Sequence, residues 1–196
     1  MLSYNEPQLV QRLSALPSIL QVALAAACAE RLFPAYGVFC RSAGRGDEAT
    51  LREVLDRVWD HLLGNKMTVD QVQDALARCM DLIPGDDDTP YLDEQPYAED
   101  AGSAAAYALR ALEGGGPQEA GWAARHAYEA LDHYVIHHVG IEDEQQILAH
   151  PLLQAEFARQ ERDVDECGTA PDPVALIARL RERAQAEAAS YFGAPP

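Results

Sequence analysis

The apolar residues of the chain recur every three or four positions along most of its length, which is the period of an α-helix. Between residues 47 and 63 the apolar positions are Leu51, Val54, Leu55, Val58, Trp59 and Leu62. This spacing predicts a helix with one apolar face and places Trp59 in the core. Asp47 stands at the start of the segment and is expected to cap the helix N-terminus.

Proline, glycine and capping residues divide the same pattern into further helices. The expected segments are 6–15, 17–33, 68–83, 97–112, 117–138, 143–149, 151–167 and one that begins at Pro173. No alternating run of β-branched residues of useful length occurs. The sequence therefore predicts an all-α fold, an irregular bundle of about seven to nine helices that forms a single domain over residues 1–196.

Two of these segments carry stronger signals. Residues 17–33 are apolar nearly all round, which is typical of a helix at the centre of a fold. Pro34 is expected to kink or end that helix, with a further turn or two reaching Cys40, because a proline removes a backbone hydrogen bond. Thr68 and Gln71 have the spacing of a capping box at the start of the helix expected over 68–83.

Residues 84–96 read PGDDDTPYLDEQP and combine three prolines with five carboxylates. We expect a mobile acidic loop that proteases cut easily, because its carboxylates repel one another and its prolines remove backbone donors. The loop does not match an EF-hand. Counting from Asp86, the sixth and twelfth residues are Tyr91 and Tyr97 instead of the required glycine and glutamate.

The net charge of −17 excludes several classes of partner. A general nucleic-acid binder needs a cationic surface for the phosphates, and anionic membranes repel an acidic protein. The longest apolar stretch, residues 19–29, is shorter than the ~20 residues of a membrane span, and no signal-peptide pattern opens the chain. We therefore expect a cytoplasmic protein with no nucleic-acid partner and no membrane partner.

The four cysteines form no C-x-x-C pair, so the sequence offers no cysteine-based zinc site and no thioredoxin-like motif. The one lysine, Lys66, lies in an expected turn, which disfavours Schiff-base and phosphate-loop chemistry. No cofactor and no catalytic residue is predicted, and the balance leans against an enzyme.

Histidines on the 117–138 segment are the strongest candidates for chemistry. His126, His133 and His137 share one stripe of the helix, and His133 and His137 are four residues apart, so the two could hold one metal ion. Glu129 is a possible third ligand. His126 is not expected to join them, because it lies roughly 10 Å along the axis from His133. The alternative is a structural or surface role, since imidazolium near a helix C-terminus is favoured by the dipole.

One order of residues is distinctive: Glu30-Arg31-Leu32-Phe33-Pro34-Ala35-Tyr36, Phe39-Cys40, Gly46-Asp47, and Leu51 through Trp59. Ile83-Pro84 followed by three aspartates and a tyrosine is a second, less specific segment. These segments resemble the bacterial domain-of-unknown-function family 416 (YjaG-like), over most of the chain and best over residues 28–60. The resemblance implies an all-helical, bacterial, cytoplasmic protein. It implies no activity and transfers no catalytic residue.

Two hypotheses for function follow. The first is a non-enzymatic helical protein that binds another macromolecule, such as a protein partner, or associates with itself. The alternative is a metal-binding protein or metal-assisted enzyme that uses His133 and His137, with Glu129 as a further ligand.

Overall fold

The computed structural model describes residues 1–85, 92–189 and 191, which form nine α-helices and two short π-helical segments. The elements in chain order are α1 (Glu6–Ser14), α2 (Ser18–Ala43), α3 (Glu48–Leu62), α4 (Val69–Asp81), α5 (Gln95–Arg110), η1 (Ala111–Gly115), α6 (Pro117–Tyr134), η2 (Val135–Val139), α7 (Glu144–Ala149), α8 (Pro151–Thr169) and α9 (Pro173–Ala188). No strand occurs among the described residues. The predicted all-α class and helix number are confirmed.

The helix starts follow the capping residues of the sequence. The Asp47 carboxylate accepts a hydrogen bond from the Thr50 amide, 2.9 Å away, at the start of α3. Thr68 and Gln71 form the complete reciprocal capping box of α4. Each of these contacts pairs an amide that would otherwise lack a partner in the first turn.

At Pro34, where the sequence predicts a kink or an end, helix α2 does not end but continues to Ala43, three residues beyond Cys40. Pro34 has no amide to donate to the Glu30 carbonyl, so one backbone hydrogen bond is missing there. Burial on both sides of the proline compensates, since Arg31, Leu32, Ala35 and Tyr36 all lie in the core. The segment expected as one helix over 117–138 is divided into α6 and η2.

The expected acidic loop at 84–96 is only partly described, since its residues 86–91 lie outside the described part of the chain. The predicted mobility and proteolysis of the loop therefore stay predictions. On its far side α5 begins at Gln95, two residues before the expected start. The Gln95 side chain is buried and its amide donates to the Gly85 carbonyl at 2.8 Å, which joins the two flanks of the loop.

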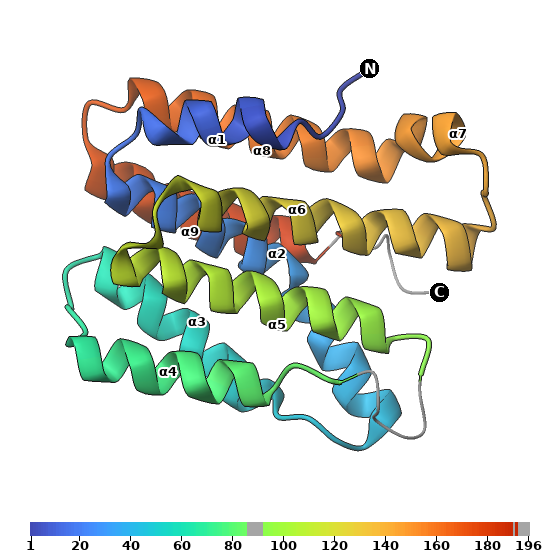
Figure 1. Ribbon diagram of the computed structural model, residues 1–196, viewed down its shortest axis with the longest axis horizontal. Coiled ribbons are helices and arrows are strands. Elements are labelled where there is room, and N and C mark those ends of the chain that lie inside the picture. The colour runs from blue at the N-terminus through green and yellow to red at the C-terminus, as the bar shows by residue number, and fades with distance from the viewer. Residues whose placement is uncertain (86–91, 190, 192–196) are drawn as a thin grey trace.

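Helix α2 is the centre of the bundle, as predicted, and packs against α3, α5, α6, α8 and α9 (Figure 1). Helices α5 and α6 lie side by side and antiparallel, with the turn at Gly114–Gly116 between them. Both helices are rich in buried alanine, including Ala101 and Ala105 of α5 and Ala123 and Ala127 of α6. Such small side chains allow two helix backbones to approach closely.

The long apolar helix α2 also has the length and composition of a membrane span. In the structure 83% of its apolar part is buried inside the bundle, as in the core helix of a soluble protein. A signal sequence near an N-terminus satisfies the same test of length and hydropathy. Localisation in the cytoplasm therefore stays a prediction.

The buried position of Trp59 gives a direct test of the core. Its side chain is fully buried, and its indole N–H donates to Glu30 Oε2 at 2.9 Å. Trp59→Ala is expected to lower the free energy of unfolding by about 3–5 kcal/mol, because it leaves a cavity and removes a donor to a buried carboxylate. Urea denaturation followed by circular dichroism measures the loss.

Trp122, the other tryptophan, is the matched control because it is only half-buried. Trp122→Ala should cost clearly less than Trp59→Ala. Equal losses for the two variants would contradict the assignment of Trp59 to the centre of the core.

Candidate metal centre

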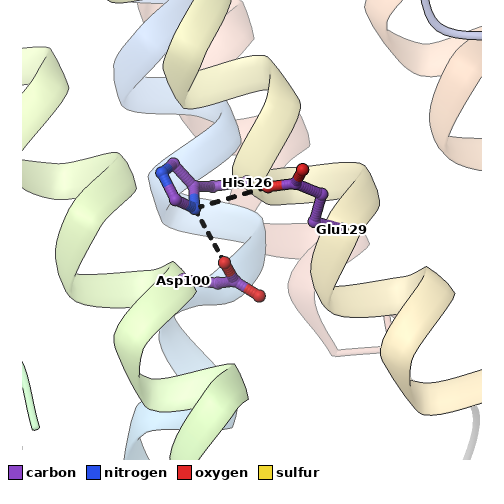
Figure 2. A group of neighbouring side chains, drawn as sticks. All are labelled: Asp100, His126 and Glu129. Atoms are coloured by element: carbon purple, nitrogen blue, oxygen red, sulfur yellow. Dashed lines mark hydrogen bonds and ion pairs between the residues drawn. The ribbon is translucent and has the colours of Figure 1, made fainter. Parts of the chain in front are cut away.

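Asp100 of α5 and His126 and Glu129 of α6 form a compact group of potential metal ligands (Figure 2). One ligand atom from each residue lies within 4.8 Å of the other two. His126 Nδ1 is hydrogen-bonded to Asp100 Oδ1 at 2.7 Å and lies 4.0 Å from Glu129 Oε2. We call these three residues the seam group, because they lie where α5 and α6 meet.

The distances in the seam group are close to those that one metal ion requires. Zinc binds imidazole nitrogen and carboxylate oxygen at ~2.0–2.2 Å, so two ligands of one ion lie roughly 3–4 Å apart. The Asp100–His126 contact would open slightly around an ion, whereas the His126–Glu129 distance already fits. Small side-chain rotations are therefore enough to bring the three ligands onto one ion.

Helix geometry explains why Glu129 belongs to this group. Cα–Cβ bonds of an α-helix tilt toward its N-terminus, so residue i reaches back toward i−3 and i−4. Glu129 accordingly faces His126, three residues earlier, and its Oε1 accepts a hydrogen bond from Arg125 Nε at 2.7 Å. Its other carboxylate oxygen, Oε2, is the one that lies nearer His126.

The seam group carries more negative than positive charge in a half-buried position. The side chains of Asp100, His126 and Glu129 are 15%, 23% and 33% exposed. Burial raises the pKa of Asp100 above its ordinary value, and the hydrogen bond and charge of His126 lower it only in part. The ionised Asp100 thus lacks full compensation for the water it loses, a deficit that a bound cation would remove.

Aromatic side chains hold His126 in place. Tyr107 stacks on the His126 ring at a centroid distance of 5.5 Å, and Trp122 packs against Tyr107 at 5.4 Å. The imidazole is therefore fixed from one side by a ring and from the other by Asp100. Ligands that are positioned before the ion arrives lose less conformational freedom on binding.

The sequence-predicted ligands His133, His137 and Glu129 do not come together as one set. The rings of His133 and His137 do lie near one another, with centroids 4.1 Å apart. Glu129 is placed with His126 instead, and no group of three ligands that includes His133 or His137 occurs in the described part of the chain. His126, excluded from the expected site, is the histidine of the seam group.

Sequence reasoning also missed a buried charge cluster on α2. Arg31 is 1% exposed and bonds Glu156 at 2.9 Å and Asp163 at 3.1 Å, both on α8. Glu30 is 3% exposed and accepts two hydrogen bonds from Arg52 of α3. The sequence signal for this cluster is the adjacent pair of charges, Glu30 and Arg31, inside an otherwise apolar helix. The partners of these charges are opposite charges, so the arrangement supports a structural role.

An isosteric change at Asp100 tests whether the seam group serves stability or binding. A raised carboxyl pKa means that the folded state holds the proton more tightly than the unfolded state, so stability falls as pH rises through the pKa of the folded state. At neutral pH, Asp100→Asn removes this cost and keeps an oxygen that can face His126. We expect the variant without metal to melt no lower than the wild type at pH 7.

The difference should shrink at about pH 4, near the ordinary aspartate pKa, where Asp100 itself becomes neutral. Calorimetry in the presence of a chelator measures both values. A clearly lower melting temperature for Asp100→Asn at pH 7 would identify Asp100 as a structural residue.

Comparison with known proteins gives a consistent family match. A model of the family described as "Protein of unknown function (DUF416)" matches residues 8–194. The uncharacterized protein YjaG of Escherichia coli K12 is 34% identical over 77 residues, and the alignment covers 39% of this chain and 39% of that protein. A crystal structure of a DUF416 family protein from Shewanella baltica OS155 superposes with a TM-score of 0.81 at 23% identity, and covers 95% of this chain and 98% of that one. The structural likeness shows the shared fold.

Proposed function

This chain belongs to the DUF416 family, and we propose that it is a helical protein that binds a divalent metal ion through Asp100, His126 and Glu129. The family description names no activity, so the proposal rests on the geometry of the seam group. The observation that carries it is the approach of three ligand atoms from two helices to within 4.8 Å of one another.

The chemistry of the ligands indicates the class of metal. One imidazole nitrogen with two carboxylate oxygens suits Zn²⁺, Mn²⁺ or Fe²⁺ better than the all-oxygen ions Ca²⁺ and Mg²⁺. Because the protein supplies three ligands, at least one coordination position is left for water or for another ligand, as in zinc sites of the open type.

Binding replaces a proton by the metal ion at a defined atom. His126 Nδ1 faces Asp100 Oδ1, and an ion between them would take the place of the proton that the two atoms share. That proton would leave to solvent from a doubly protonated imidazole, or move to Nε2 of a neutral one, so that in either case His126 binds as a neutral imidazole with its proton on Nε2. Metal binding therefore competes with protonation of the ligands and weakens in acid.

Macromolecular binding or self-association, the first hypothesis from the sequence, stays a prediction. Large exposed apolar side chains of the described residues are distributed over several elements, among them Val38 of α2, Met80 of α4 and Val174 of α9. Metal binding is favoured because a specific group of residues supplies its geometry.

Isothermal titration of untagged, chelator-treated protein with Zn²⁺ and Mn²⁺ tests the proposal. We expect one tightly bound ion per chain, and Asp100→Asn or His126→Ala should weaken its binding about 10-fold or more, because each removes a ligand. Asp132→Asn is the matched control, since Asp132 is a half-buried carboxylate on α6 outside the seam group. Equal affinities for the wild type and Asp100→Asn would disprove the site.

A change at Arg125 is expected to tighten metal binding instead of weakening it. Its guanidinium pairs with Glu129 and so competes with a metal ion for that carboxylate. Arg125→Gln should therefore tighten metal binding roughly 2- to 5-fold, the equivalent of one exposed ion pair. Arg57→Gln is the control, because Arg57 also forms an i,i+4 ion pair, with Glu53 on α3, outside the seam group. Weaker binding by Arg125→Gln would show that Glu129 is not a ligand.

A further inference from the structure

A second pair of potential ligands lies farther along α6. His133 and His137 are one turn apart, and their ring centroids are separated by 4.1 Å at an interplanar angle of 37°. His133 is half-buried and His137 is exposed. Two imidazoles four residues apart on one helix can share a single ion, with water in its other coordination positions. We call them the histidine pair.

Neighbouring side chains position His133 and keep His138 apart from the pair. His138 does not belong to it, because its Nδ1 is hydrogen-bonded to the Tyr97 hydroxyl at 3.0 Å and its ring stacks on Tyr134. The Tyr97 ring packs edge-on against His133 at a centroid distance of 5.4 Å, which holds the His133 imidazole beside that of His137.

The histidine pair and the seam group lie on the same stripe of α6 but are separate sites. His133 follows His126 by seven residues, which is roughly 10 Å along a helix. Glu129 leans toward His126 and away from His133. No single ion can therefore contact both sets of ligands, although an ion that leaves one set is within a short diffusive step of the other.

The two sites differ in the number of their ligands and in the exposure of those ligands to solvent. The pair offers two ligands, one of them exposed, so bound ions exchange rapidly with solvent. The seam group offers three ligands at 15–33% exposure, two of which are carboxylates, so it holds an ion more tightly. The net charge of −17 draws cations to the whole surface and favours a first, loose encounter.

We propose that His133 and His137 form a second, labile transition-metal site that captures ions and loads the Asp100–His126–Glu129 group. This role rests on metal binding by the seam group. An ion binds first at the exposed pair and then moves to the seam group, which holds it more tightly. Removing the pair should therefore slow loading while leaving the final affinity unchanged.

Stopped-flow quenching of tryptophan fluorescence by Ni²⁺ tests the loading step. Trp122 contacts Tyr107, which stacks on His126, so it reports on the seam group. A Trp59→Phe background makes Trp122 the only tryptophan of the chain. The double change His133→Ala and His137→Ala should slow quenching at least about five-fold, because capture near the site raises the local ion concentration. His138→Ala, in the same turn, is the control and should load at the wild-type rate.

Equilibrium titration of the chain without the Trp59 change separates the two claims. Wild type should bind two Ni²⁺ ions, the double variant one tight ion, and Asp100→Asn one weak ion held by the pair. An unchanged loading rate in the double variant overturns the loading role, even if the number of bound ions falls. If the wild type binds a weak ion but no tight ion, the proposed function is overturned instead.

Discussion

The bundle depends on the pairing of two charges at its centre. Glu30 and Arg31 are adjacent on α2, the helix that contacts most of the others, and both are almost completely buried. An unpaired charge in such a place costs several kcal/mol, so each requires a partner from another helix. Glu30 and Arg31 point to different neighbours, and this divides the packing of the fold into two parts.

Each of the two charges determines which helices cover α2 on its side. Glu30 accepts two hydrogen bonds from Arg52 and one from Trp59, which fixes α3. Arg31 bonds Glu156 and Asp163 of α8. These contacts leave the remaining face of α2 to α5 and α6, whose alanine-rich surfaces pack closely against it. The position of the seam group is therefore a consequence of how α2 is surrounded.

Local signals in the sequence were sufficient for the helices but insufficient for the site. Period and capping residues predicted α3 and its cap at Asp47, because both depend on neighbours within a few residues. Whether the helix is kinked or ended by Pro34 could not be decided from the sequence, since tertiary burial compensates for the missing hydrogen bond. Asp100 has no local signal that links it to His126, because the two meet only when α5 packs antiparallel to α6. The spacing of residues along the sequence could suggest only metal ligands that lie on one helix.

The contrast between the two polar clusters indicates which one serves function. Around Arg31, four arginines (31, 159, 162 and 183) face four carboxylates (156, 163, 166 and 187), so the charges balance within the protein. In the seam group Asp100 and Glu129 face one arginine, Arg125, which is half exposed and bonds only Glu129. Asp100 is hydrogen-bonded to His126, and burial still raises the pKa of its carboxyl group. The charges of the Arg31 cluster balance within the fold, whereas the carboxylates of the half-buried seam group have less cationic compensation, which a bound cation would supply. That difference favours the seam group, and not the deeper Arg31 cluster, as the place where this protein meets its ligand.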